Sequence, residues 1–330
     1  MQAYAIRRLF LIIPTLALVT IIVFMLVRFI PGDVIDMMMA QMQEQSGLGA
    51  GLTEEYLREE MGLDQPLLVQ YGRWLGVWPQ KDGSVSGILE GNLGDSLWKN
   101  EPVMDELEQR IPVSVELGII ALLTGLIIAI PIGVYSSIRQ DSMGDYSGRT
   151  IAILFISVPA FWLGTMVIVY PSIWWGWTPS LEYIPFAQDP GANLIQFLIP
   201  GIIMGMVMSG TTMRFTRTMM LEVLRQDYIR TAWSKGLRER TIIIRHVLKN
   251  ALIPVVTIIG MTVPFLISGT VIIEQIFCLP GIGRLLFDAL TQRDYPIISG
   301  INLVIASLVL VMNLLVDVTY AWLDPRIQYK

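Results

Sequence analysis

The residues most often used for catalysis and metal binding are scarce in this 330-residue chain, which holds one histidine, His246, and one cysteine, Cys278. A single cysteine excludes a disulfide framework and a cysteine-cluster metal site. A single histidine excludes zinc motifs built on paired histidines, and no set of residues resembles a catalytic site. The sequence therefore predicts a chain that is not an enzyme and that binds no metal or cofactor. We expect His246 to be solvated or to lie at an interface, and Cys278 to act as a small apolar residue.

Residues that could bind a partner gather in one segment. Nine basic residues lie there: Arg214, Arg217, Arg225, Arg230, Lys235, Arg238, Arg240, Arg245 and Lys249. Apolar residues from Leu221 to Ala232 recur at helical spacing, Gly236 then interrupts as a residue after a helix C-terminus would, and 238–250 is helical again. The pattern predicts a helix, a glycine turn and a second helix with a basic exposed side. Such a segment either only sets membrane topology and meets lipid headgroups, or binds a soluble partner protein.

The elements that must position this segment are membrane spans. The chain is 53% hydrophobic and only 15% charged, whereas soluble domains carry roughly 25% charged residues. A helix crosses a membrane with about 20 apolar residues, and six stretches qualify: 9–30, 112–136, 150–171, 194–213, 251–273 and 297–316. No cleavage site follows the first stretch, so we expect it to be an uncleaved span. The predicted fold is all-α and integral to the membrane, with six transmembrane helices and an outer helical cap segment between the first two.

The charges of the loops orient the spans. Segments 1–8, 137–149, 214–250 and 317–330 together hold 15 basic residues and, with Asp317 counted in the sixth span, 6 acidic ones, whereas segments 31–111, 172–193 and 274–296 hold 7 basic and 20 acidic. Because basic loops stay in the cytoplasm, we expect both termini to be cytoplasmic, in a multi-pass protein of the cell membrane. The net charge of −5 is the sum of a basic inner face and an acidic outer face. This net negative charge argues against binding of nucleic acid.

Six motifs resemble the permease subunits of ABC importers, in the dipeptide/oligopeptide/nickel branch. The run DYIRTAWSKGL (227–237) is similar to the EAA loop of these permeases, although Arg230-Thr231-Ala232 replaces the acidic-Ala-Ala triplet. The other matches are RFIPGD (28–33), LDQPLLVQ (63–70), GNLGDS (91–96), EQIFCLPGIGRL (274–285) and LDPR (323–326). Together with the six spans, these matches cover nearly the whole chain.

The resemblance implies half of a type I import channel. Its partners would be a second, non-identical permease subunit, one or two ATPase subunits that use ATP and magnesium, an extracytoplasmic substrate-binding protein and membrane lipid. The EAA loop would couple to the ATPase through Arg230, Thr231, Ala232, Lys235, Gly236, Leu237 and Arg238. In this interpretation Ala232 allows close approach of the partner. The outer loop would contact the substrate-binding protein through Pro280, Gly281, Gly283 and Arg284.

The resemblance leaves the solute open between di- and oligopeptides, the leading interpretation, and nickel, oligosaccharides or another small solute. An ion-coupled secondary transporter is a remote alternative, because it would carry ionisable residues near the membrane midplane and spans three to six have none. Four smaller interpretations concern single residues of the spans. Arg28 is expected to extend its charge to the membrane interface, Glu116 to stabilise the start of its helix through the helix dipole, and Asp317 to pair with a basic residue of the inner loop. The methionines of span four, 204, 206, 208 and 213, either line a path or fill gaps between helices.

Overall fold

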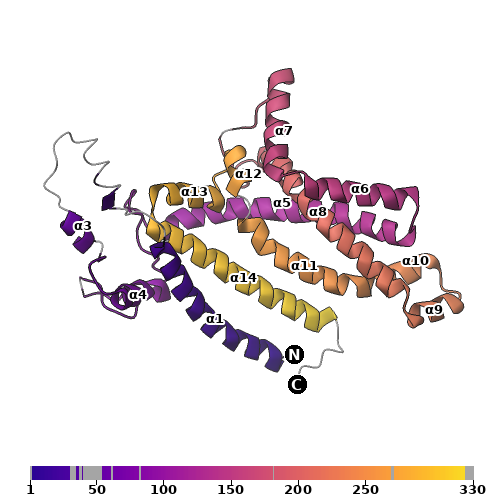
Figure 1. Ribbon diagram of the computed structural model, residues 1–330, viewed down its shortest axis with the longest axis horizontal. Helices are drawn as coiled ribbons and strands as arrows, with labels where there is room; N and C mark the ends of the chain where they lie inside the picture. The colour runs from indigo at the N-terminus through magenta and orange to yellow at the C-terminus, as the bar shows by residue number, and fades with distance from the viewer. Residues whose placement is uncertain are drawn as a thin grey trace. The chain divides into compact units, whose positions relative to one another are not determined.

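The computed structural model describes residues 2–29, 35–36, 39, 54–60, 62–81, 83–180, 182–268 and 271–323. Within these ranges the regular elements are helices, shown in Figure 1. They are α1 (Gln2–Arg28), α3 (Glu54–Glu60), α4 (Leu67–Leu75), η1 (Ile88–Glu90), α5 (Val103–Ile138), α6 (Met143–Ser157), α7 (Ala160–Trp175), α8 (Pro190–Leu224), α9 (Asp227–Ser234), α10 (Glu239–Thr241), the π-helix η2 (Ile242–Leu248), α11 (Lys249–Ser268), α12 (Val271–Ile276), α13 (Ile282–Gln292) and α14 (Tyr295–Leu323). Most of the motifs RFIPGD and LDPR, and the side chain of Asp317, lie outside the described residues.

The spans confirm the predicted all-α membrane fold. Among the residues that the structure describes, five stretches of helix are long and apolar enough to cross a membrane: Phe10–Arg28, Val103–Ile138, Pro190–Leu224, Glu239–Val263 and Tyr295–Val316. The pair Met143–Ser157 and Ala160–Trp175 brings the number to six if it is one broken span. The long helices α5 and α8 run beyond the predicted spans 112–136 and 194–213, because each continues into its amphipathic flanking segment.

The third predicted span, 150–171, is not one straight helix. Its residues belong to α6 and α7, which meet at an angle of 89° across the break. Val158 takes an extended conformation (φ −87°, ψ 120°) just before Pro159. A residue before proline is driven out of the helical region, and proline itself cannot donate the next helical hydrogen bond. The sequence showed this proline, but it did not predict the size of the bend.

The chain divides into two compact units. Unit 1 comprises Met1–Ile6, Ile111–Arg284 and Leu308–Lys330, and unit 2 comprises Arg7–Arg110 and Leu285–Ser307.

Small residues allow α5 and α8 to pack with their backbones in contact in unit 1. A Cβ atom placed on Gly205 of α8 would lie 2.7 Å from the carbonyl oxygen of Ala121 and 3.0 Å from the amide nitrogen of Gly125, both in α5. Gly201 lies one turn earlier on α8, so the two glycines form a G-x-x-x-G contact of the kind that joins membrane helices. On the same helix Met208 and Met213 are buried, and their side chains lie close to Gly125 and Gly148. Their burial favours the gap-filling interpretation of these methionines.

Unit 2 contains the outer cap segment. The phenyl ring of Phe24 on α1 lies 5.2 Å from the Tyr71 ring and 5.6 Å from the Trp74 ring, both on α4. The Thr20 hydroxyl lies 2.9 Å from the Tyr71 hydroxyl, within hydrogen-bonding distance. A glycine-turn segment, 83–94, follows α4, and its Gly83, Gly91 and Gly94 all have positive φ. The aromatic cluster of Phe24, Tyr71 and Trp74 thus packs the described part of the outer cap segment against α1.

Candidate functional site

The basic segment folds as predicted into a short helix, a glycine turn and a second helical stretch. Its first helix, α9, is buried on one side only. Ile229 is fully buried and Ala232 is 9% exposed. They belong to a cluster contributed by α8, α9, η2 and α11: Met220, Ile229, Ala232, Ile242, Ile243, Val247 and Ala251. An eight-residue helix is too short to be stable alone in water, so this cluster holds α9 in place.

The other side of α9 and the turn after it are exposed. Six of the seven predicted coupling residues have exposed side chains or, for glycine, an exposed backbone: Arg230, Thr231, Lys235, Gly236, Leu237 and Arg238. Ala232 differs, because it faces the cluster of its own chain. Its small size lets α9 approach η2, which corrects the interpretation that it allows a partner to approach. The large side chains of Tyr228 and Trp233 are also exposed, at 47% and 46%.

Gly236 closes α9 in the way its position predicted. Its φ is +73°, a left-handed conformation that glycine adopts without a steric penalty. The Gly236 N–H donates to the Trp233 carbonyl (2.9 Å), and the Leu237 N–H donates to the Ala232 carbonyl (3.4 Å). These two bonds form a Schellman motif, which satisfies the last carbonyls of the helix. No atom outside the adjoining residues lies within 4 Å of a Cβ placed on Gly236, so the turn projects into open space.

The second helical stretch connects α9 to α11 through a π-helix. The residues of η2, Ile242–Leu248, form i→i+5 turns, which are rare and often occur at functional sites. A side-chain contact ties the two ends of the segment together. The Asn250 amide donates to the Tyr228 hydroxyl (3.1 Å) and to the His246 carbonyl (2.7 Å). His246 itself is partly exposed, in agreement with its predicted place near a surface.

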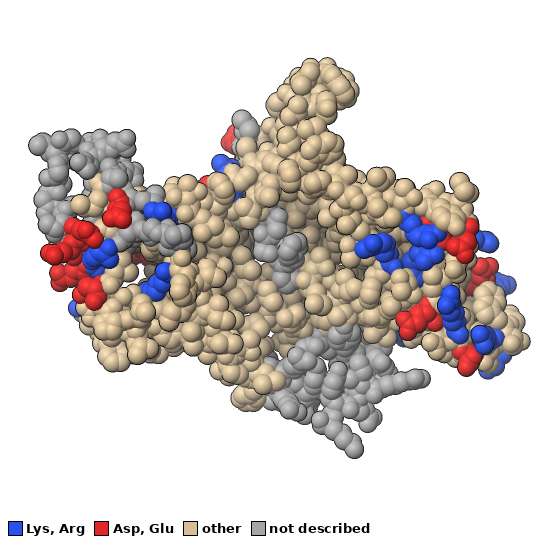
Figure 2. Space-filling model, viewed as in Figure 1, with Lys and Arg blue, Asp and Glu red and all other residues tan. Residues whose placement is uncertain are grey.

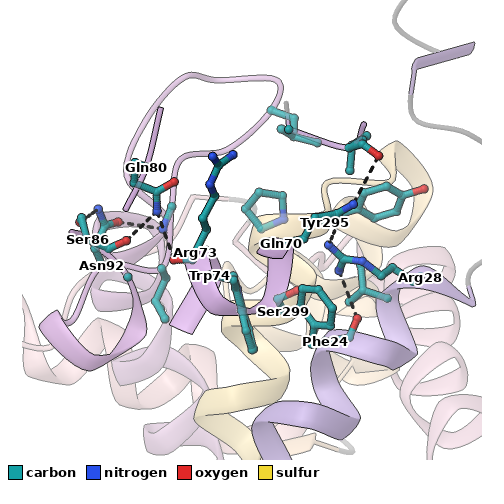
Figure 3. Close-up of a pocket in the computed structure, with 18 of the residues that line it drawn as sticks. Phe24, Arg28, Gln70, Arg73, Trp74, Gln80, Ser86, Asn92, Tyr295 and Ser299 are labelled. Atoms are coloured by element: carbon teal, nitrogen blue, oxygen red, sulfur yellow. Dashed lines mark hydrogen bonds between the residues drawn. The ribbon is translucent and has the colours of Figure 1, made fainter. Parts of the chain in front are cut away.

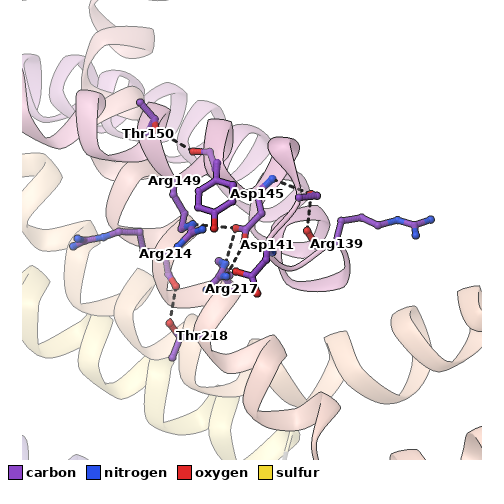
Figure 4. A network of polar contacts seen from close by, with 10 residues as sticks. Arg139, Asp141, Asp145, Arg149, Thr150, Arg214, Arg217 and Thr218 are labelled. Atoms are coloured by element: carbon purple, nitrogen blue, oxygen red, sulfur yellow. Dashed lines mark hydrogen bonds and ion pairs between the residues drawn. The ribbon is translucent and has the colours of Figure 1, made fainter.

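Unit 1 also contains a buried carboxylate, that of Asp145, at the beginning of α6 (Figure 4). Asp145 is fully buried, and it accepts hydrogen bonds of 2.8 Å from both Nε and Nη2 of Arg217 on α8. Arg149 lies one turn along α6, with its Nε 3.3 Å from Asp145 Oδ1, and its guanidinium carbon lies 4.5 Å from the centre of the Tyr146 ring. The Asp141 N–H donates to the other carboxylate oxygen (3.0 Å). Among the described basic residues of segment 214–250, Arg217 is thus the one that forms a buried ion pair.

The remaining basic residues form an exposed charged surface. Figure 2 shows blue side chains gathered over α9, α10 and the neighbouring ends of α6 and α8, with a few acidic side chains between them. The pair Arg230–Asp227 has an N···O distance of 3.4 Å, but its side chains are 75% and 95% exposed. Such a pair contributes little to stability. The charges at this end are therefore available to a partner rather than used to hold the fold.

The predicted contact residues of the outer loop have mostly internal roles. Gly281 and Gly283 are buried, and a Cβ on Gly281 would lie 2.3 Å from the Glu274 carboxylate. Glu274 is fully buried and accepts hydrogen bonds from the Ser114 hydroxyl (2.6 Å) and from the Arg284 N–H (2.9 Å). Ser114 in turn accepts from the Ile282 N–H (2.8 Å). This motif therefore ties the loop to α5, through a Ser114 contact that could not be predicted from the sequence.

The interpretation of Glu116 needs correction, and those of Arg28 and Cys278 remain predictions. Glu116 does not lie near a helix N-terminus, since α5 begins at Val103, so the dipole argument was wrong. Its carboxylate instead accepts a hydrogen bond of 3.4 Å from Asn193 on α8. Arg28 is exposed at the end of α1, and its place at the membrane interface stays a prediction. Cys278 is partly buried, with a positive φ of 56°.

Comparison with known proteins identifies the family. Residues 129–329 match the family described as the inner membrane component of binding-protein-dependent transport systems, and residues 1–118 match its N-terminal part. A Brucella abortus (strain 2308) protein named as a peptide transport system permease is 38% identical over 330 residues, which cover 100% of both chains. The dipeptide transport system permease proteins of Escherichia coli (strain K12) and Alkalihalophilus pseudofirmus are 35% and 36% identical, again over 100% of each chain.

A solved structure extends the likeness to the fold. The MetNI methionine ABC transporter, in an inward-facing conformation, has a chain that matches 68% of this one and 99% of its own length, with a TM-score of 0.51 and 16% identity. The family match covers the whole region of α6 to α14, including the basic segment. The chain therefore belongs to the binding-protein-dependent transport system inner membrane components, the permease subunits of ABC importers.

Proposed function

We propose that this permease forms half of the translocation path of a peptide importer and that α9 with the Gly236 turn couples the path to an ATPase. The observation that carries the coupling proposal is the asymmetry of α9. Its inner face is held by the buried cluster around Ile229, while its outer face and the following turn are exposed and basic. Such a helix can seat in a cleft of another subunit without losing any contact with its own chain.

The attachment of α9 explains how motion would pass into the membrane. The cluster that holds α9 includes Met220 of α8 and Ala251 of α11, and α8 is itself in backbone contact with α5 through Gly205. Because packed helices shift as bodies rather than deforming, a displacement of α9 would be carried by these helices. Alternating access then needs no ionisable residue in the spans and no catalytic group in this chain.

The partners follow from this arrangement. ATP and magnesium would be used by one or two separate ATPase subunits, whose clefts would complement Lys235, Arg238 and Arg240 with acidic rims. A second, non-identical permease would complete the path, and an extracytoplasmic binding protein would deliver the solute. The chain would lie in the cytoplasmic membrane with both termini inside, as the excess of basic residues in its predicted inner loops indicates.

Peptides are the favoured solute because full-length relatives at 35–38% identity are named for peptide or dipeptide transport. The test is uptake by the complete transporter in proteoliposomes, supplied with its binding protein and ATP. Labelled di- and tripeptides should accumulate and should stimulate ATP hydrolysis, whereas nickel ions and oligosaccharides should do neither. Uptake of nickel or a sugar, with no response to peptides, would contradict the peptide assignment but leave the coupling proposal intact. Co-purification of an ATPase and a second permease with this chain would test the subunit composition.

A further inference from the structure

Unit 2 contains a cavity that the transport cycle described above does not use. Its volume is about 570 Å³, and it is lined by the end of α1, by α4, by the glycine-turn segment and by the start of α14 (Figure 3). Figure 3 shows Arg28 reaching it from α1 and Arg73 from α4. Pockets of this size hold small molecules or the headgroups of larger ones.

The charged residues that line the cavity are all basic. They are Arg28, Arg73 and Lys81, and no aspartate or glutamate is among the described lining residues. In the part of the chain that the structure describes, no ion pair joins any of the three to a carboxylate. Three cations around one cavity repel one another unless an anion lies between them, and the described walls of the cavity supply no such counter-charge.

The hydrogen bonds of Arg28, Arg73 and Lys81 use only some of their N–H donors. Arg28 donates from Nη1 to the Phe24 carbonyl (3.2 Å) and from Nη2 to the Gln70 side chain (2.6 Å). Arg73 donates from Nε to the Pro79 carbonyl (3.1 Å), and Lys81 donates to the Glu59 carbonyl. All four acceptors are neutral. A guanidinium group has five N–H donors and an ammonium group has three, so these bonds orient the cations and leave several N–H groups for a ligand.

Apolar walls complete the cavity. Phe24, Trp74 and Leu93 line it together with the cations, and the Arg28 guanidinium is stacked 3.5 Å from the centre of the Phe24 ring. Arg28 is the last residue of the apolar stretch Phe10–Arg28, whose outer surface is exposed at Ile22 and Leu26. The cavity therefore lies at the end of a helix that is long and apolar enough to cross a membrane, and the ends of such helices are expected at the level of the phospholipid headgroups.

We propose that this cavity binds the phosphate group of an anionic phospholipid. Arg28, Arg73 and Lys81 would surround the phosphate, since arginine and lysine are the side chains that proteins use for phosphate oxygens. The glycerol and the first part of the acyl chains would contact Phe24 and the apolar surface of α1. Inorganic phosphate offers the same oxygens without an apolar body, so it is the alternative source of this chemistry.

The test uses the assembled transporter, freed of lipid in detergent, and phosphatidylglycerol or phosphatidylcholine with a fluorescent acyl chain. Phosphatidylglycerol should bind more tightly than phosphatidylcholine and should raise the thermal midpoint of the transporter. The double variant Arg73→Gln/Lys81→Gln should weaken phosphatidylglycerol binding about tenfold or more, since each basic residue near an anionic headgroup contributes measurably. The single variant Lys81→Gln, whose side chain is exposed, should give a smaller loss in the same direction.

The control Arg58→Gln/Arg139→Gln removes the same charge from a half-exposed and an exposed position outside the cavity and should bind the lipid like the unmodified protein. Equal binding by the Arg73→Gln/Lys81→Gln variant and this control would overturn the proposal. Competition by inorganic phosphate separates the two sources. Little displacement at equal concentration supports a lipid, whereas displacement as effective as by unlabelled phosphatidylglycerol would overturn the lipid assignment in favour of a free anion.

Discussion

The guanidinium group of Arg217 forms two parallel hydrogen bonds of 2.8 Å with the carboxylate of Asp145, which has no solvent-exposed surface. This bidentate pair joins the beginning of α6 to α8. Breaking a buried ion pair from one side leaves a charge without a partner, which costs about 3 kcal/mol or more. The pair is therefore expected to matter for the stability of the chain as well as for the placement of α6.

The first prediction concerns this pair. Asp145→Asn and Arg217→Gln should each lower the thermal midpoint of the purified transporter, and the double variant should be less destabilised than the sum of the two. Arg214→Gln is the matched control, because Arg214 lies one turn away on α8 and is exposed. Additive effects in the double variant would show that the two side chains do not interact in the folded protein.

The Gly236 turn gives a prediction about coupling. Gly236→Arg should leave the amount of protein in the membrane unchanged, since nothing in the chain occupies the space around this residue, but it should abolish ATP hydrolysis stimulated by the loaded binding protein. Gly236→Ala should retain most of the stimulation, because it adds the backbone strain of a positive φ without the bulk.

Gly176 offers a matched control for that experiment. It has a φ of +65°, also follows the end of a helix, and has nothing within 4 Å of a placed Cβ. Gly176→Arg should therefore carry the same strain and the same charge without affecting stimulated hydrolysis. Normal stimulation of ATP hydrolysis in Gly236→Arg would contradict the assignment of this turn to the ATPase contact.

The α5–α8 contact predicts graded effects of small substitutions. A Cβ on Gly205 meets backbone atoms of Ala121 and Gly125, which cannot move without moving α5, whereas a Cβ on Gly201 meets the side chain of Ile120 at 2.4 Å. We therefore expect Gly205→Ala to cost about 1–3 kcal/mol by overpacking, and Gly201→Ala to cost less because Ile120 can change its rotamer. Thermal unfolding of the two variants in detergent measures the order, and a larger loss at Gly201 would contradict it.

The carboxylate of Glu274 gives a prediction for the outer loop. Glu274→Gln places an NH₂ group where two donors, the Ser114 hydroxyl and the Arg284 N–H, now point at oxygens. Losing one charged hydrogen bond costs about 2 kcal/mol, so the thermal midpoint should fall. Asp288→Asn, at an exposed residue of α13, is the control. If Glu274→Gln instead left the thermal midpoint unchanged and weakened only the response to the binding protein, the stabilising role of Glu274 would be contradicted. The result would then favour a contact between this loop and the binding protein.

The features that could be predicted from sequence are the ones encoded by neighbouring residues. The spans follow from long apolar runs, and the Schellman turn follows from Gly236 after a helical pattern. The contacts that escaped prediction join residues far apart in the chain. Asp145 and Arg217 are 72 residues apart, and Ser114 and Glu274 are 160 apart, so no periodicity relates them.

The positions at which helices begin were also predicted poorly from the sequence. The apolar run placed the second span at 112–136, but α5 begins at Val103 because its amphipathic first turns bury Val103 and Leu107. The dipole interpretation of Glu116 failed for this reason. The π-helix η2 could not be foreseen either, since the same apolar residues suit an α-helix and only the hydrogen-bond register differs.

The two sides of α9 are subject to different selective constraints. Substitutions at Ile229 must be tolerated by the buried cluster of the chain itself, and they can be compensated only by changes within the same gene. Substitutions at Arg230 or Lys235 leave that cluster untouched, and they have to be matched by changes in the gene of another subunit. The inner face should therefore diverge slowly in every lineage, while the outer face should drift together with its partner, so that exchanging this segment between related transporters would change which partner is accepted without disturbing the fold.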